Sequence, residues 1–385
     1  MCIRDSNTSV LLADPSVTSD EGYLRILSVV GHEYFHNWTG NRVTLRDWFQ
    51  LSLKEGLTTY REMRFAVDQY GPLARLDYIF DLIERQFPED KGPTAHPILT
   101  DAYVSIDNFY TATTYTKGAE VLRMLEDIVG YEALTRGICA YLTTFDGKAA
   151  TIDDFLGVLS EQCDFDMEGF KAWYLQKGTP SIDIKTTYDS DKKCLQLSVS
   201  QTADLEKNAS SYRPKLLPIV GKMYSASGTV LSCDINEGVG EVRENDFVLM
   251  MSESNQTWEF SVDEAPVIST FRGLSAPVKH TDDLTIEQNA VLIAHDDDPY
   301  VRFKKSQDLW VYALQHGFDE KLLAVFDKPM EDVFDHPSLT SLCMRLPSVK
   351  FCQEWVGGFE FDDLSEDYNA LKKVIGTRWS AQWQK

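Results

Sequence analysis

The sequence predicts a multidomain α+β protein with a helix-rich domain, then a β-sandwich, then the start of an all-α helical array. Its 385 residues exceed the roughly 100–200 that form one domain, and 43% of them are hydrophobic, which is enough for packed cores. Hydrophobic residues recur every three or four positions before Gly178-Thr179-Pro180 and every second position after it, and the helical spacing returns from about Leu284. We therefore place the domains at residues 7–179, 180–281 and 282–385.

The first domain is expected to open with a helix that carries two histidines. Thr18 and Glu21 have the spacing of a capping box at its start, apolar residues follow at intervals of three and four, and Thr39-Gly40-Asn41 ends it. A second helix is expected at about residues 52–70, because Gly71-Pro72 follows. Four more helices, each bounded by Gly or Asp, are predicted at residues 117–129, 131–142, 152–163 and 167–176.

The β-sandwich is expected from short runs in which apolar and polar residues alternate, separated by turn clusters such as Asp189-Ser190-Asp191. These runs contain Ile182 and Ile184, then Leu195, Leu197 and Val199, then Trp258, Phe260 and Val262. Residues 247–250 are all apolar, which suits a strand buried on both faces. In the third domain, the acidic residues before Pro299 are predicted to cap a helix.

The charge and the cysteines exclude several classes of protein. A net charge of −23 leaves no basic face to follow phosphates, so we expect no nucleic-acid partner. No apolar run approaches the ~20 residues of a membrane span, and we expect no membrane association. The seven cysteines are widely spaced without a C-x-x-C pair, and no export signal is recognisable at the start. We therefore expect a reduced, cytoplasmic protein.

The clearest chemical signal is the run His32-Glu33-Tyr34-Phe35-His36 in the first helix. Residues four apart lie on the same helix face, so His32 and His36 can bind one metal ion with Glu33 close by. A catalytic zinc ion needs a third protein ligand and an open position for water. Glu55 on the second helix is our candidate, because the eighteen-residue spacer lets the chain turn back beside the first helix. The alternative is a pair of core histidines without a metal.

Several segments resemble the bacterial aminopeptidase N group of gluzincin zinc metallopeptidases. The resemblance covers residues 30–64 and continues through 95–98, 108–111, 115–121 and 173–180. These segments together are far more specific than the five-residue zinc signature alone.

For the architecture, the resemblance implies a thermolysin-like zinc peptidase domain at residues 7–179. The family also has an N-terminal β-saddle domain and a much longer C-terminal helical domain, so the sequence resembles a truncated member. The Gly-Ala-Met-Glu-Asn segment, which binds the substrate's free amine in the family, is not found, and residues 1–6 stand in its place. We therefore expect the chain alone to hydrolyse amino-acid anilides poorly or not at all.

Site roles follow from the motif and the resemblance. One zinc ion per chain, held by the two histidines and Glu55, would activate a water, and Glu33 would be the general base. Tyr115 matches the tyrosine to which the family assigns donation to the oxyanion. Tyr110 matches a side chain lining the pocket for the first substrate residue, with core packing as the alternative. Glu62 is a candidate acceptor for a hydrogen bond from a ligand histidine, with an exposed helix carboxylate as the alternative.

The resulting hypothesis is a zinc-dependent aminopeptidase that acts on peptides with a free N-terminus through a metal-activated water. One alternative is another zinc hydrolase on the same scaffold, either an endopeptidase or an epoxide-hydrolase-like enzyme. A second alternative is an inactive fragment with an intact metal site. Only the exopeptidase requires a free amine, so an amino-acid anilide and its N-acetylated form distinguish it from an endopeptidase.

Overall fold

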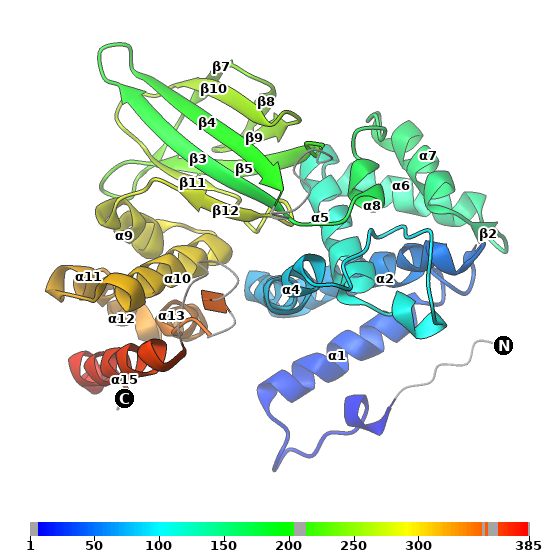
Figure 1. Ribbon diagram of the computed structural model, residues 1–385, viewed down its shortest axis with the longest axis horizontal. Coiled ribbons are helices and arrows are strands. Elements are labelled where there is room, and N and C mark those ends of the chain that lie inside the picture. Colours follow the sequence, from blue (N-terminus) through cyan, green and yellow to red (C-terminus); the bar gives the residue numbers. More distant parts are fainter. Residues whose placement is uncertain (1–6, 204–212, 349–350, 353–360, 384–385) are drawn as a thin grey trace. The chain divides into compact units, whose positions relative to one another are not determined.

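The protein has the three parts that the sequence predicts, in the same order: helices, two β-sheets, and helices again (Figure 1). The computed structural model describes residues 7–203, 213–348, 351–352 and 361–383. Within these, the chain forms two compact units. The first unit comprises the described residues among 1–180, 202–218 and 275–278. The second contains most of the sheet residues and the C-terminal helices.

The first unit is built mainly from helices. They are α1 (Asp20–Phe35), α2 (Leu51–Tyr70), α3 (Arg75–Asp81), α4 (Phe87–Lys91), α5 (Gly118–Val129), α6 (Tyr131–Thr144), α7 (Ile152–Cys163) and α8 (Ala172–Leu175). Short 3₁₀ helices are η1 (Thr8–Val10), η2 (Trp48–Gln50), η3 (Pro72–Ala74) and η5 (Ile106–Phe109), and π-helical turns are η4 (Leu82–Gln86) and η6 (Thr113–Lys117). Strands β1 (Thr44–Leu45) and β2 (Ala149–Ala150) pair in parallel.

The start of α1 differs from the predicted capping box at Thr18. Ser19 is the N-cap, and its hydroxyl accepts a hydrogen bond from the backbone N–H of Gly22 at 3.2 Å. The Thr18 hydroxyl instead accepts from the N–H of Asp14 at 2.9 Å and closes the preceding loop. The predicted cap was wrong by one residue, because either of two adjacent hydroxyls can cap a helix and only the loop decides between them.

Of the later helices predicted in this unit, only the last is wrong. Helices α2, α5, α6 and α7 lie where the sequence places them, and α7 begins after the N-cap Thr151. Residues 167–176 form a turn followed by the short α8 instead of one helix. Gly169 disfavours a helix there. The indole N–H of Trp173 donates to the Leu216 carbonyl at 2.6 Å, so tertiary packing also shapes this backbone.

Two sheets form the β domain. One has the strand order β12-β3-β4-β10-β7, and the other has the order β11-β5-β9-β8 with β6 paired to β5. The strands are β3 (Pro180–Asp189), β4 (Cys194–Ala203), β5 (Leu217–Tyr224), β6 (Val230–Leu231), β7 (Asp234–Glu237), β8 (Gly240–Arg243), β9 (Asp246–Met251), β10 (Asn255–Ser261), β11 (Val267–Thr270) and β12 (Lys279–Asp282). Strand β12 is parallel to β3, whereas β10 is antiparallel to β4 and to β7.

The core of the β domain comes from the residues whose alternation the sequence shows. In the register of β4 and β10, Leu197 lies opposite Trp258 and Leu195 opposite Phe260, and all four are buried. The rings of Phe260 and Phe247 are 5.1 Å apart and join one sheet to the other. Strand β9 contains three consecutive buried residues, which confirms the prediction that both its faces are covered.

Helices follow the sheets, as predicted. They are α9 (Ile286–His295), α10 (Pro299–His316), α11 (Glu320–Ala324), α12 (Asp327–Glu331), the 3₁₀ helix η8 (Asp332–Phe334), α13 (Pro337–Met344), α15 (Phe361–Arg378) and α16 (Ser380–Trp383). Asp298 is the N-cap of α10, and its carboxylate accepts from the N–H of Val301 at 2.9 Å. The predicted acidic cap before Pro299 is therefore confirmed.

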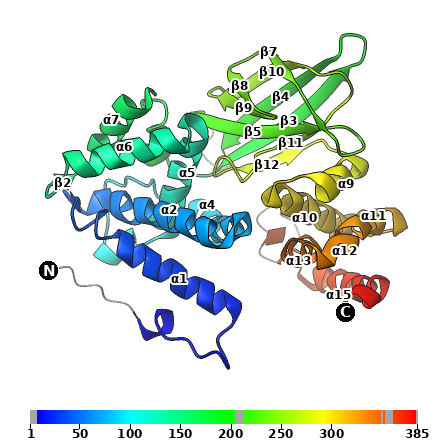
Figure 2. The same cartoon turned by 180° about the vertical axis from the view of Figure 1, so that it is seen from behind.

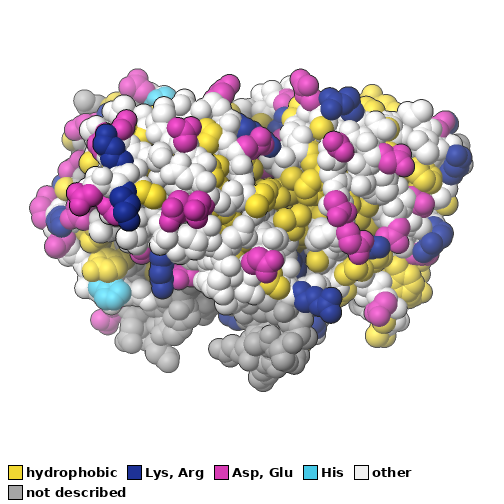
Figure 3. All heavy atoms as spheres, turned by 90° about the horizontal axis from the view of Figure 1, so that it is seen from above, with side chains coloured by type: hydrophobic (Ala, Val, Ile, Leu, Met, Phe, Trp, Pro, Cys, Tyr) yellow, Lys and Arg dark blue, Asp and Glu magenta, His cyan; other side chains and the backbone are white. Residues whose placement is uncertain are grey.

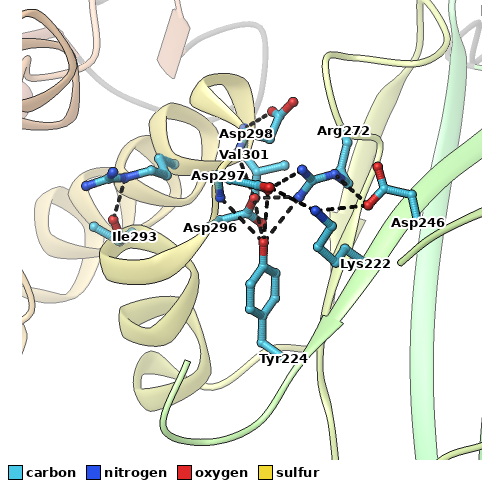
Figure 4. A network of polar contacts seen from close by, with 10 residues as sticks. Lys222, Tyr224, Asp246, Arg272, Ile293, Asp296, Asp297, Asp298 and Val301 are labelled. Carbon is cyan, nitrogen blue, oxygen red and sulfur yellow. Dashed lines mark hydrogen bonds and ion pairs between the residues drawn. The ribbon is translucent and has the colours of Figure 1, made fainter. Parts of the chain in front are cut away.

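A partly buried polar network ties the start of α10 to the sheet that contains β5 and β9 (Figure 4). The Arg272 guanidinium donates to Asp296 at 2.6 Å and also to Asp297. The Lys222 ammonium donates to Asp297 at 2.8 Å and lies 3.1 Å from Asp246. Because opposite charges are paired in this way, the cost of burying each of them is offset.

Charged side chains of both signs lie on one face of the molecule. On the face shown in Figure 3, acidic side chains are scattered among basic, polar and hydrophobic ones. Among the described helices, none is both long and apolar enough to cross a bilayer. The described cysteines are free thiols, namely Cys139, Cys163, Cys194, Cys233, Cys343 and Cys352.

Candidate metal centre

The three predicted metal ligands lie together in the first unit. One potential ligand atom from each of His32, His36 and Glu55 lies within 4.8 Å of the others. The Nε2 atoms of His32 and His36 are 3.2 Å and 3.1 Å from the same carboxylate oxygen, Oε2 of Glu55. Among the described residues, this is the one group of His, Cys, Asp and Glu side chains that meets the geometry of a metal site.

Antiparallel packing of α1 against α2 brings these groups together (Figure 2). His36 contacts Glu55 near the start of α2, whereas His32, one turn earlier in α1, also contacts Glu62 farther along α2. The close approach depends on Gly31, the buried residue of α1, because a Cβ there would lie 3.1 Å from the ring of Phe65. His36 is the C-cap of α1, and its N–H still bonds to the carbonyl of His32, so the spacing of four keeps both rings on one face.

Both histidines are oriented by hydrogen bonds at their second ring nitrogen. Nδ1 of His36 donates to the backbone carbonyl of Thr39 at 2.8 Å. Nδ1 of His32 lies 3.0 Å from Oε2 of Glu62, and the hydroxyl of Tyr78 donates to the other oxygen of Glu62 at 2.8 Å. The Glu62 side chain is only 13% exposed. It therefore occupies the position predicted for an acceptor from a ligand histidine, and it is not an exposed helix carboxylate.

The hydrogen bond at Nδ1 of His36 determines what its Nε2 can offer to the Glu55 carboxylate. Because the Thr39 carbonyl can only accept, Nδ1 of His36 carries a proton. Nε2 of His36 then faces the Glu55 carboxylate either with a second proton, which it donates, or with a lone pair. In the second case both facing atoms are acceptors. Two acceptors 3.1 Å apart repel one another unless a cation shares their electron pairs. A zinc ion, which binds imidazole nitrogen and carboxylate oxygen, fits these donors.

Protons and metal ions compete for this position. Burial lowers the pKa of His32, but hydrogen bonds to Glu55 and Glu62 outweigh it and raise that pKa to about 9. Burial raises the pKa of Glu55, but hydrogen bonds from both histidines hold it far below its usual value. The Lys54 ammonium, 2.9 Å from Oε1 of Glu55, acts in the same direction. Glu55 is therefore ionised at neutral pH and available as an anionic ligand.

Tyr115 lies beside His32, and Glu33 directly follows His32 in α1. The Tyr115 ring stacks on His32 with centroids 6.2 Å apart and planes 18° apart. Burial raises the pKa of Tyr115 far above its usual value, with further contributions from the carboxylates of Glu55 and Glu33. Its hydroxyl therefore remains a donor across the physiological range. Glu33 is half-buried and is not one of the three grouped ligands.

Tyr110 lies on the surface near Tyr115. Its side chain is 47% exposed, and its ring is 6.4 Å from that of Tyr115 and 6.3 Å from that of Trp48. Core packing, the alternative that the sequence left open, does not describe such a residue. Its exposed ring belongs instead to an aromatic group that includes Phe109.

Comparison with known proteins places this geometry in a family. Residues 2–174 match the model of the peptidase family M1 domain. Residues 178–283 match a domain of unknown function with an Ig-like fold (DUF3458), and residues 286–385 match the DUF3458 C-terminal domain, which consists of ARM repeats. The three matches together run through nearly the whole sequence. The chain contains a peptidase family M1 domain.

Relatives of this M1 chain are aminopeptidases. It is 38% identical to aminopeptidase N of Caulobacter vibrioides, in an alignment that covers 89% of this chain and 39% of the relative. It is also 38% identical to aminopeptidase N of Escherichia coli, in an alignment that covers 96% of this chain and 44% of the relative. Aminopeptidase A of Legionella pneumophila, solved in complex with aspartic acid, superposes with a TM-score of 0.85 at 25% identity, covering 98% of this chain and 42% of that one. The chain thus spans less than half the length of these relatives.

Some features of the M1 site were not predicted from the sequence. The Thr39 carbonyl and the Lys54 ammonium are immediate neighbours of ligand residues, and their role depends on how the chain turns after α1. Tyr78 lies on α3, a helix that the sequence analysis did not assign. The π-helical turn that carries Tyr115 also has no signal in the hydrophobic spacing, because its buried residues are all threonine or lysine.

Proposed function

We propose that this M1 chain binds one zinc ion through His32, His36 and Glu55 and provides the metal centre of an aminopeptidase acting on peptides with a free N-terminus. The convergence of three ligand atoms within 4.8 Å is the observation that carries the proposal. When bound, zinc lowers the pKa of a coordinated water to about 7 and polarises a carbonyl oxygen. Because the chain spans less than half of its relatives, the activity of the whole protein is part of this proposal.

The chain's own residues would perform three tasks. Glu33, beside the ligands but not among them, would take a proton from the attacking water and return it to the leaving amine. The Tyr115 hydroxyl, kept protonated by its surroundings, would donate to the oxygen that becomes negative in the transition state. Glu62 and the Thr39 carbonyl would hold the imidazoles in the tautomer that leaves Nε2 free.

Zinc content tests the metal centre directly. We expect about one zinc ion per chain in the wild type, measured by elemental analysis after exhaustive dialysis. Replacing both histidines, His32→Ala and His36→Ala, should abolish binding because a single carboxylate ligand remains. The variant His316→Ala is the control, since this exposed residue on α10 lies outside the site. Equal zinc in the wild type and the double variant would overturn the assignment.

A pair of substrates tests the reaction. The zinc-loaded chain is assayed at high concentration with an amino-acid anilide and with its N-acetylated form, because weak turnover is expected. Hydrolysis of the free-amine compound alone supports the aminopeptidase, and Glu33→Gln should lower that rate by about 10²–10⁴-fold while zinc stays bound. Equal hydrolysis of both compounds would favour an endopeptidase. Bound zinc without hydrolysis of either would contradict the proposed activity of this chain.

A further inference from the structure

The geometry points to Glu89 and Asp90 as positioning residues, which hold the π-helical turn η6 so that Tyr115 faces the metal centre. Neither residue is one of the three grouped ligands His32, His36 and Glu55. Both lie on α4, and each holds one end of η6. This inference rests on the proposed function, because it takes Tyr115 as the donor to the reacting oxygen.

The turn η6 presents a single side chain to the site. Every residue from 112 to 122 is buried except Tyr115, which is half-buried. A π-helical turn contains one more residue than an α-helical turn and recurs at functional sites, since it rotates the following side chains. The orientation of Tyr115 therefore depends on keeping η6 in this less common form.

Glu89 holds the first end of the turn. Its carboxylate accepts hydrogen bonds from the backbone N–H of Ala112 at 3.2 Å and of Thr113 at 2.7 Å, and from the hydroxyl of Thr113. N–H groups at the start of a helix have no partner within it, and an anion is favoured there by the helix dipole. Glu89 therefore fixes where the turn begins.

Asp90 holds the other end through a fully buried ion pair. The Lys117 ammonium donates to Oδ2 of Asp90 at 2.6 Å, and both side chains are 1% exposed. Asp90 also accepts from the N–H of Gly178 at 2.8 Å, and its position is therefore itself fixed. Lys117 is the last residue of η6, two positions after Tyr115.

The middle of the turn is attached to the helix that carries a ligand. The hydroxyl of Ser52, three residues before Glu55 on α2, donates to the carbonyl of Thr114 at 2.9 Å. This bond keeps η6 beside α2, whereas Glu89 and Asp90 determine its rotation by holding its two ends. Loss of either carboxylate should turn the Tyr115 ring without removing a metal ligand.

The experiment measures where Tyr115 lies relative to the metal. The full chain, with 3-fluorotyrosine incorporated at position 115, is loaded with Co²⁺, and the paramagnetic relaxation of the fluorine is recorded by NMR. Relaxation falls with the sixth power of distance. For a fluorine about as far from the metal as the Tyr115 ring lies from the His32 ring, which is 6.2 Å, a displacement of about 1 Å away from the metal would lower the relaxation about two- to threefold. A displacement of this size is enough to cost about a hundredfold in rate.

Four variants are compared. Asp90→Asn and Lys117→Met break the buried pair, and Glu89→Gln weakens the other attachment while leaving the pair intact, so that it tests the inference even if the first two fold poorly. Glu126→Gln is the matched control, because it also removes a buried carboxylate. Glu126 accepts hydrogen bonds from Tyr60 and Arg64 of α2 and lies at the far end of α5, away from η6. We expect about two- to threefold lower relaxation in the first three variants and wild-type relaxation in the control, with Co²⁺ content unchanged.

The outcomes separate this inference from the proposed function. A wild-type chain that binds no Co²⁺ would contradict the metal centre itself. Wild-type relaxation in Glu89→Gln and Asp90→Asn, with metal bound, would overturn the positioning role. A decrease in Glu126→Gln as large as in Asp90→Asn would also overturn it, because the effect would then be a general loosening. Where turnover is measurable, Glu89→Gln should lower kcat more than it raises KM, which is also the result expected for Tyr115→Phe.

Discussion

Replacing Gly118 with alanine should separate helices α2 and α5 at the metal centre. A Cβ at Gly118 would lie 2.2 Å from the hydroxyl of Ser52 and 3.2 Å from the Cα of Gly56. The Ser52 hydroxyl is already fixed by its bond to the Thr114 carbonyl, so it cannot move away without breaking that bond. The backbone at Gly118 has an ordinary helical φ of −58°, which alanine adopts without strain. Any loss of stability in Gly118→Ala therefore comes from steric overlap of the added Cβ.

Two opposing terms set the magnitude. Alanine is a better helix former than glycine by about 1 kcal/mol. Forcing an extra carbon into a packed contact costs about 1–3 kcal/mol. We therefore expect Gly118→Ala to be neutral to destabilising, by up to about 2 kcal/mol. The control is Gly157→Ala on α7, where a Cβ meets nothing within 4 Å, and the helix should gain up to about 1 kcal/mol.

Amide hydrogen exchange followed by mass spectrometry is the suitable assay, because it reports the free energy of opening for each helix and does not require two-state unfolding. Peptides from α2 and α5 should exchange as fast as in the wild type or faster in Gly118→Ala, and peptides from α7 should exchange more slowly in Gly157→Ala. Stabilisation of α5 by Gly118→Ala, equal to that of α7 in the control, would refute the claim that close packing requires glycine.

Three further predictions concern the charged groups. Burial raises the pKa of Asp90, but the paired ammonium lowers it from 3.8 to about 2, so its stabilising charge is complete above about pH 4 and lost as the pH falls through 2. Urea denaturation should show a steeper loss of stability in this window for the wild type than for Asp90→Asn. Arg272→Met should destabilise the second unit by about 3–5 kcal/mol, because it leaves Asp296 buried without its cation, and a loss below about 1 kcal/mol would contradict this. Glu62→Gln should weaken zinc binding about 10–100-fold in chelator competition, through poorer orientation of His32, and unchanged affinity would remove Glu62 from the site.

The sequence predicted those elements whose signals are local. Helix α7 covers the predicted residues 152–163, because the hydrophobic spacing that indicates it lies within the segment itself. Strand β5 was not assigned: Pro218 and Gly221 disfavour a strand, yet nearly every residue of β5 is buried in the sandwich. Helices α3 and α4 were also not assigned, since η4 interrupts their period between Leu82 and Gln86.

The same distinction applies to the candidate site. The ligand spacing and the partner of His32 depend only on two helices and the short connection between them, and the structure brings those residues together as predicted. Tyr115 was found only by resemblance to a family, because nothing in the spacing of residues 113–117 indicates a π-helical turn. The groups that stabilise this turn, Glu89 and Asp90, are 24 and 27 residues distant from their partners and are visible only in the fold.

Glycines set the distances on which the metal centre depends. Gly31 precedes His32 and meets a ring from α2, Gly56 follows Glu55 and approaches α5, and Gly118 opens α5 immediately after the turn that carries the tyrosine. Each glycine therefore lies next in sequence to a functional side chain or to the turn that carries one. A Cβ at Gly56 or Gly118 would press on the backbone of the other helix, and a Cβ at Gly31 would press on the ring of Phe65. Because three helices meet through these contacts, a displacement at one glycine shifts a ligand or the tyrosine relative to the others. Errors of about 1 Å cost about a hundredfold in rate, and the arrangement of the site thus depends on residues that contribute no functional group of their own.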